Sequence, residues 1–302
     1  MFFRQRTLLT FALFSAAAGA FACGEPKTER RPQAAAFQLD DFGDTINAAR
    51  PARRIVSLNP VTTELLFTLG AGNRVVGRTH WDLYPDAARA VPDLGNGMEP
   101  NVEAVLGVHP DLVVLYAGAS NRAAAVQLRK AGINTLAIRD DRISDFRRTV
   151  ELLARVTGDT AAGTTIADSV ERSLAAVSAR PRPAKPVTVF FHVWDSPILT
   201  IGRGSYIDEL LTAAGATNVF GDLAAPSPQV TLEEIVRRNP DFILVGPASA
   251  KKLRESSLWR AVPAVRDGRL LIVDTLLVGR PGVRLGEAAR SLRALILRDT
   301  VR

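Results

Sequence analysis

Glu103-Ala-Val-Leu-Gly-Val-His-Pro-Asp-Leu-Val-Val-Leu115 returns later in the chain as Glu233-Glu-Ile-Val-Arg-Arg-Asn-Pro-Asp-Phe-Ile-Leu-Val245. Each segment is a short amphipathic run that opens with a glutamate, ends at Pro-Asp and continues into an apolar strand. A second pair precedes it, because Glu64-Leu-Leu ahead of Gly70 matches Glu209-Leu-Leu ahead of Gly215. Two matched units in the same order predict two lobes of similar build with a cleft between them.

The flanking sequence predicts an α/β fold. Short apolar strands alternate with helical runs from residue 54 to residue 138, and again from residue 187 onward, which favours parallel sheets with helices on their faces. Between these regions, residues 160–180 have apolar side chains at helical spacing, and a helix of this length spans about 30 Å. We therefore expect two Rossmann-like lobes, residues 37–159 and 186–302, joined by a single long interlobe helix over residues 160–180.

Residues 1–22 have the features of a signal peptide. Arg4 and Arg6 precede an apolar run that is short for a membrane span, and Ala20-Phe21-Ala22 supplies the small residues of a cleavage site. Ala20-Phe21-Ala22-Cys23 resembles the bacterial lipoprotein box, although the usual leucine three residues upstream of the cysteine is missing. We expect lipid attachment at Cys23, the only cysteine, with residues 23–36 as a tether. The alternative is ordinary secretion, with Cys23 as the mature N-terminus.

The charge distribution argues against a nucleic-acid partner. The chain has a formal net charge of +7, but its basic residues are scattered and are not interleaved with aromatic residues in a stripe. We expect a monomer with a mildly basic, solvated surface.

Arg54-Ile-Val-Ser-Leu-Asn-Pro-x-x-Thr-Glu-Leu-Leu66 resembles the opening signature of the periplasmic binding proteins for metal chelates. Members of this family carry cobalamin, ferric siderophores or haem to ABC importers. Further matches follow in order at Tyr84-Pro85, at Gly215-Ala216 and at Pro228-Gln229-Val230-Thr231. The resemblance implies two α/β lobes, a ligand held in the cleft, and one glutamate on each lobe that docks onto arginines of the importer's membrane subunits. These glutamates correspond to Glu103 and Glu233, for which a favourable charge at a helix N-terminus is the alternative role.

The expected ligand is a metal chelate that is transported and is not a resident cofactor. Trp81, Tyr116 and Trp194 lie where strands end toward the expected cleft, and they correspond to ligand-facing aromatic residues of the family. Candidates for pairing with an anionic chelate are Arg78, Arg203 and Arg280. The aromatic residues that the cobalamin-binding members have near Gly97-Met98 and at Ser227 are absent, and so is the tyrosine that haem carriers of the family often offer to iron around residues 96–98. Corrinoids and ferric siderophores are therefore the expected ligands, with haem as the alternative.

Other classes of protein receive less support. The three histidines, His80, His109 and His192, are too far apart in sequence to predict a metal site. The chain lacks a Gly-x-Ser-x-Gly elbow, a P-loop and a dinucleotide fingerprint. Asp82 and Asp195 are the only pair that suggests a cleft hydrolase, and a tethered sensor or scaffold is a third class. We expect a solute-binding lipoprotein outside the cytoplasm that is not an enzyme.

Overall fold

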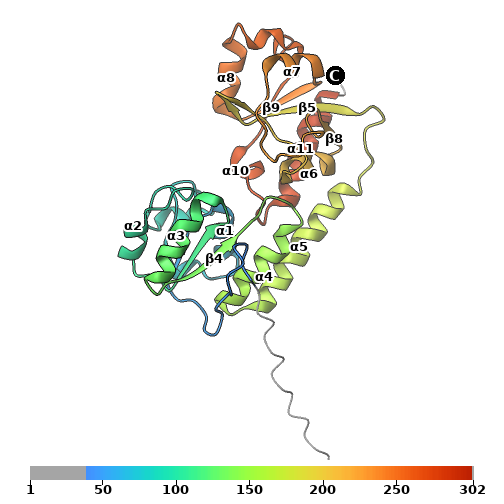
Figure 1. Ribbon diagram of the computed structural model, residues 1–302. Coiled ribbons are helices and arrows are strands. Elements are labelled where there is room, and N and C mark those ends of the chain that lie inside the picture. The colour runs from blue at the N-terminus through green and yellow to red at the C-terminus, as the bar shows by residue number, and fades with distance from the viewer. Residues whose placement is uncertain (1–38, 301–302) are drawn as a thin grey trace, which may run out of the picture. The chain divides into compact units, whose positions relative to one another are not determined.

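The computed structural model describes residues 39–300, which belong to one compact unit (Figure 1). The predicted signal peptide, Cys23 and the tether lie outside the described residues. The first sheet contains β1 (Ile55–Ser57), β2 (Val75–Gly77), β3 (Leu112–Tyr116) and β4 (Asn134–Ile138), and the second contains β5 (Val187–His192), β8 (Ala216–Asn218), β9 (Phe242–Val245) and β10 (Leu270–Ile272). A separate antiparallel pair is formed by β6 (Trp194–Asp195) and β7 (Ile198–Leu199).

The two main sheets have the same topology. Their strands are all paired in parallel, and their orders are β2-β1-β3-β4 and β8-β5-β9-β10. If the four strands of each sheet are numbered 1 to 4 in chain order, both sheets have the strand order 2-1-3-4. The predicted α/β fold with two lobes of similar build is confirmed.

Helices connect the strands in both lobes. The first lobe contains α1 (Pro60–Thr68), α2 (Val102–Gly107), α3 (Ala119–Lys130) and α4 (Asp145–Thr157), with short 3₁₀ turns η1 (Gly72–Arg74) and η2 (Asp86–Ala90). The second contains α6 (Tyr206–Ala214), α7 (Leu232–Arg238), α8 (Pro247–Glu255), α9 (Pro263–Arg266), α10 (Thr275–Val278) and α11 (Leu285–Thr300), with the 3₁₀ turn η3 (Trp259–Ala261). Helix α5 (Thr160–Ser178) links the two series and packs against α4 of the first lobe and against α6 and α11 of the second (Figure 1).

The repeated Pro-Asp motif fixes equivalent strands in each lobe. His109 and Asn239, which precede the two motifs, have positive φ angles of 49° and 43°, the left-handed conformation in which helices commonly end. The following carboxylate of Asp111 accepts hydrogen bonds from the backbone N–H groups of Arg53 and Arg54 at 2.9 and 3.0 Å, directly before β1. Asp241 accepts from the N–H of Thr188 on β5 at 2.8 Å in the same way. The motif therefore holds the start of β3 beside β1 and the start of β9 beside β5.

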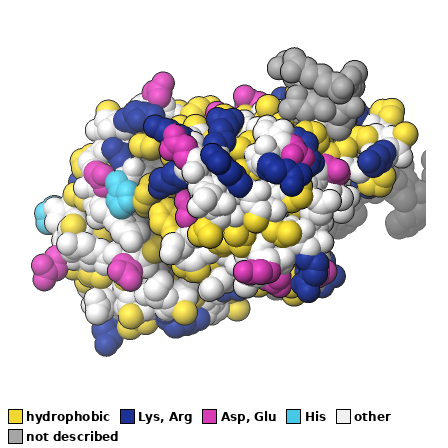
Figure 2. Space-filling model, turned by 90° about the horizontal axis from the view of Figure 1, so that it is seen from above, with side chains coloured by type: hydrophobic (Ala, Val, Ile, Leu, Met, Phe, Trp, Pro, Cys, Tyr) yellow, Lys and Arg dark blue, Asp and Glu magenta, His cyan; other side chains and the backbone are white. Residues whose placement is uncertain are grey.

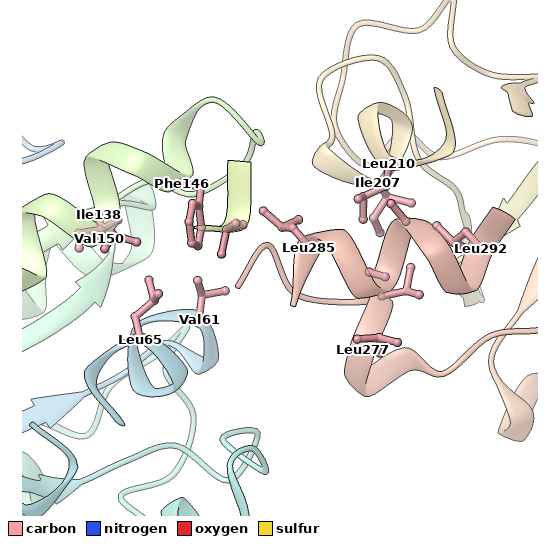
Figure 3. Packing of buried hydrophobic residues seen from close by; sticks show 14 of the residues in the cluster. Val61, Leu65, Ile138, Phe146, Val150, Ile207, Leu210, Leu277, Leu285 and Leu292 are labelled. Carbon is pink, nitrogen blue, oxygen red and sulfur yellow. The ribbon is translucent and has the colours of Figure 1, made fainter. Parts of the chain in front are cut away.

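The largest hydrophobic cluster extends through both lobes. It includes Leu65 of α1 and Phe146 of α4 from the first lobe, together with Leu210 of α6 and Leu292 of α11 from the second. Figure 3 shows Leu285, at the start of α11, between the labelled residues of the two lobes. Because this apolar core is continuous, separating the lobes exposes hydrophobic surface, which opposes wide hinge opening.

Asn59 is the N-cap of α1, and its side chain accepts a hydrogen bond from Val61 N. Residues 259–266 are divided between the short turn η3 and the short helix α9. Within residues 39–300, no helix combines the length and the apolar character needed to cross a membrane. On the face drawn in Figure 2, basic and acidic side chains are interspersed among hydrophobic ones.

Candidate functional site

A cavity of about 320 Å³ lies at the carboxyl ends of the strands and is lined by both lobes. The first lobe contributes Asn59, Pro60, Val61, Asp140 and Asp141, which follow β1 and β4. The second lobe contributes Val193, Ile201, Tyr206, Pro226, Ser227 and Pro281, among others. This is the position at which open parallel sheets bind ligands, and the volume is at the lower end of the range for small-molecule sites.

Two polar residues of the first lobe are joined at the cavity wall. Asn59 caps α1 by accepting from Val61 N at 2.9 Å, and its amide nitrogen donates to Asp140 Oδ2 at 3.1 Å. Burial raises the pKa of Asp140 to about 7, and the nearby charge of Asp141 adds to the rise. Asp140 therefore changes its charge near neutral pH at the surface that a ligand would contact.

The predicted aromatic residues are not among the lining residues of this cavity, but each is connected to a residue in or next to its wall. Trp194 follows the lining residue Val193 in sequence and is 62% exposed. Trp81 is 59% exposed, and its carbonyl oxygen accepts a hydrogen bond from Arg280, which lies between the lining residues Gly279 and Pro281. The Tyr116 hydroxyl donates to Oδ1 of the lining residue Asp141 at 2.7 Å, and burial raises the pKa of this tyrosine.

The three predicted arginines have different surroundings. Arg78 is buried, and its guanidinium donates to the carbonyl oxygens of Thr79 at 2.7 Å, Ala88 at 2.9 Å and Arg89 at 3.2 Å. Arg78 thus holds the segment that follows β2. The guanidinium of Arg280 is also buried, beside Trp81, whereas Arg203 is exposed.

Sequence reasoning missed the two carboxylates of the cavity wall. Asp140 and Asp141 follow β4 at the same sheet edge as Tyr116. Their signal was an apolar strand that is followed, after Arg139, by two consecutive acidic residues, a pattern that was visible in the sequence but was not used. Ser227 also lines the cavity.

Glu103 and Glu233 occupy equivalent positions outside the cavity. Each is the second residue of its helix, α2 or α7, and each is exposed. Side-chain caps come from other residues, since Asn101 caps α2 and Thr231 forms a capping box with Glu234 on α7. Within residues 39–300, neither Glu103 nor Glu233 has a hydrogen-bond or ion-pair partner for its carboxylate. Both are therefore free to bind a partner.

Comparisons with known proteins agree with this geometry. The sequence pattern of the family described as "Periplasmic binding protein" matches residues 55–275, which include strands of both main sheets. The chain belongs to the periplasmic binding protein family. The predicted family resemblance is confirmed, and the protein is a substrate-binding protein of an ABC transporter.

Individual relatives of this periplasmic binding protein cover nearly all of its length. An uncharacterized ABC transporter substrate-binding lipoprotein of Bacillus subtilis (strain 168) is 30% identical over 98% of this chain and 99% of its own. A vitamin B12-binding protein of Vibrio parahaemolyticus is 24% identical over 84% of this chain and 91% of its own. The apo structure of a periplasmic haem-binding protein from Roseiflexus sp. RS-1 has a TM-score of 0.74 and 26% identity, covering 82% of this chain and 98% of its own.

The two aspartates that suggest a cleft hydrolase have structural partners. In the binding protein, Asp82 accepts hydrogen bonds from the hydroxyls of Thr63 and Thr79, each at 2.6 Å. Asp195 lies 2.8 Å from Nε2 of the buried His192. Within residues 39–300, no group of three or more His, Cys, Asp or Glu side chains is arranged to hold a metal ion.

Proposed function

We propose that this protein captures a metal chelate between its lobes and delivers it to the membrane subunits of an ABC importer. The observation that carries the proposal is the cavity itself, which is built from both lobes and whose lining residue Asp141 accepts a hydrogen bond from Tyr116. Trp81 and Trp194 are exposed, and exposed aromatic side chains suit a large flat ligand, because stacking and burial then supply most of the binding free energy.

A corrinoid or a ferric siderophore is the proposed ligand, and haem is the alternative. The relatives named above include a vitamin B12-binding protein and a haem-binding protein, so similarity supports both. Segment 96–98 has no tyrosine to ligate haem iron, which favours the first two classes.

Titration of the purified protein with cyanocobalamin, a ferric trihydroxamate and haem, followed by tryptophan fluorescence, tests this function. We expect saturable quenching with one of the first two chelates. If none of the three binds to folded protein, the chelate-carrying function is wrong, and a tethered sensor becomes the better hypothesis.

We further propose that Glu103 and Glu233 dock onto basic residues of the importer, one from each lobe. Their exposed, unpaired carboxylates at matched helix positions support this role. Two such contacts would set the orientation of the binding protein on its importer more than they would raise affinity. The anchor is proposed to be a lipid on Cys23, which is consistent with the lipoprotein name of the Bacillus subtilis relative.

A further inference from the structure

The wall of the cavity carries acidic charge without basic charge. Asp140 and Asp141 both line it, and among the described residues around the cavity none is lysine, arginine or histidine. The remaining polar lining residues, such as Asn59, Ser205 and Tyr206, are uncharged. A ligand in this cavity therefore meets two carboxyl groups and no basic side chain among the described lining residues.

Asp140 has little compensation from the protein. Its carboxylate receives a side-chain hydrogen bond only from Asn59 among residues 39–300. The charged groups that contribute to its pKa are Asp141 and Asp145, which both raise it. The neighbouring hydroxyl of Tyr206 donates elsewhere, to the carbonyl oxygen of Val278 at 3.2 Å. Asp140 thus retains capacity to accept a hydrogen bond from a ligand.

The arginines near the cavity differ in their partners, and none of them lines it. Arg142 binds Glu209 at 2.6 Å. The buried guanidinium of Arg280 donates through Nη2 to the Trp81 carbonyl, while its Nη1 has no hydrogen-bond partner among the described residues. Arg139 donates to the carbonyl oxygen of Ala117 at 3.0 Å and lies 3.9 Å from Asp141, which it compensates in part. Arg203 is exposed and has no side-chain partner in the described residues, so it is the cation best placed to bind an anionic ligand instead.

We propose that Asp140 and Asp141 select chelates that are neutral or cationic and that present amide N–H or other hydrogen-bond donors, and that they reject chelates whose periphery carries carboxylates. This inference rests on the proposed function and assigns the ligand class of the same cavity. Amide donors would form charge-assisted hydrogen bonds to the two aspartates. A ligand carboxylate in the same place would meet like charge in a partly desolvated site, which is an effective means of discrimination.

A matched pair of ligands tests the proposal on the full-length mature chain. Cyanocobalamin has a periphery of amides, and its monocarboxylic acids replace one amide by a carboxylate without changing the ring. A neutral ferric trihydroxamate and ferric citrate form a second pair, and haem adds a ligand with two carboxylates. We expect the neutral member of the pair that binds to have a dissociation constant at least about tenfold lower than its anionic partner at pH 8.

The isosteric variant Asp140→Asn/Asp141→Asn should reduce that preference by about tenfold or more, chiefly by improving binding of the anionic member. Asp86→Asn is the control, because Asp86 is exposed and does not line the cavity, yet its replacement changes the net charge in the same direction. Melting temperatures establish that all variants are folded.

Three outcomes contradict the proposal in distinguishable ways. Tighter binding of an anionic chelate than of its neutral partner would overturn the ligand class but would support chelate transport, and loss of that binding in Arg203→Ala would assign recognition to Arg203. An unchanged preference in the double variant would remove the aspartates from selection. Absence of binding by every chelate would overturn both this inference and the proposed function.

Discussion

Glu64 and Glu209, the glutamates matched by the internal repeat, reach in opposite directions across the boundary between the lobes. Glu64 on α1 accepts from the backbone N–H of Val283, two residues before α11, at 3.0 Å. Glu209 on α6 accepts from the N–H of Ile143, two residues before α4, at 2.7 Å. Each glutamate also lies beside the arginine next to that amide, Arg284 at 3.8 Å or Arg142 at 2.6 Å. The two lobes are therefore clasped by equivalent contacts.

This reciprocal clasp limits how the cleft can open. The contacts add to the shared apolar core and to the packing of α5 against α4, α6 and α11. Opening by rotation of the lobes requires loss of at least one clasp, together with exposure of apolar surface. We expect small movements between open and closed states, in contrast to the large hinge closure of other binding proteins.

The two clasps should contribute unequally to stability. The side chain of Glu64 is 1% exposed and that of Glu209 is 26% exposed. Glu64→Ala should lower the free energy of unfolding by about 1–3 kcal/mol, because it leaves the N–H of Val283 without its acceptor. The charge of Glu64 is not the source of this stability, since burial raises the pKa of its carboxyl. Glu209→Ala should cost only about 0.2–1 kcal/mol, because water can replace this more exposed acceptor. Urea unfolding of both variants measures the difference, and a larger loss in Glu209→Ala would contradict this ranking.

Burial of Asp140 predicts a stability that falls as pH rises. Because its pKa is about 7 in the folded state and lower in the unfolded chain, the folded state binds more protons between the two values. Its neighbours are Asn59 and the like-charged Asp141 and Asp145, and Arg139 faces only Asp141. Near its pKa, loss of the proton places an uncompensated charge in a buried position.

In Asp140→Asn, the decrease in unfolding free energy from about pH 5 to about pH 8 should be smaller than in the wild type by about 2–3 kcal/mol. Part of the pH dependence of the unfolding free energy should persist in this variant, since burial also raises the pKa of Glu64 and of Asp82. Chemical unfolding at several pH values tests this. Parallel curves for the two proteins would show that Asp140 is not the titrating group.

The fold was largely predictable because the repeat and the alternation of strands and helices are local patterns. Glu103, Pro110 and Asp111 recur in register at Glu233, Pro240 and Asp241, and the equivalent strands follow directly. The site was less predictable. Arg78 was expected to face a ligand, yet its guanidinium is held by three carbonyl oxygens. Which polar side chain meets the cavity depends on contacts between distant segments, such as Asn59 with Asp140, and no local pattern encodes them.

The exposed tryptophans should report ligand binding, and the buried one should not. Trp259 is 8% exposed and packs against His192 and Phe190, whereas Trp81 and Trp194 are 59% and 62% exposed. Trp81→Phe and Trp194→Phe should each remove part of the ligand-induced quenching, and Trp259→Phe should preserve it. Replacement of either exposed indole by alanine should weaken binding by about threefold to tenfold, from lost stacking. Quenching that depends mainly on Trp259 would place the ligand elsewhere.

Lipid attachment at Cys23 predicts that the protein partitions with membranes. Cys23→Ser should leave a folded protein that binds its ligand but is released in soluble form, because the substituted residue cannot carry a thioether-linked lipid. Metabolic labelling with radioactive palmitate, followed by fractionation, compares the two chains. Equal release of wild type and variant would favour ordinary secretion.

Docking through one glutamate of each lobe predicts a loss of transport without a loss of ligand affinity. Glu103→Ala/Glu233→Ala should reduce uptake by at least about tenfold, since both orienting contacts with the importer would be missing. Each single variant should have a smaller effect. Glu287→Ala is the control, because Glu287 is an exposed carboxylate in the first turn of α11 that has no ion-pair partner among residues 39–300. Uptake of labelled ligand by cells, measured beside the dissociation constant of each purified protein, separates docking from binding. Unchanged uptake in the double variant with normal affinity would show that these glutamates do not contact the importer.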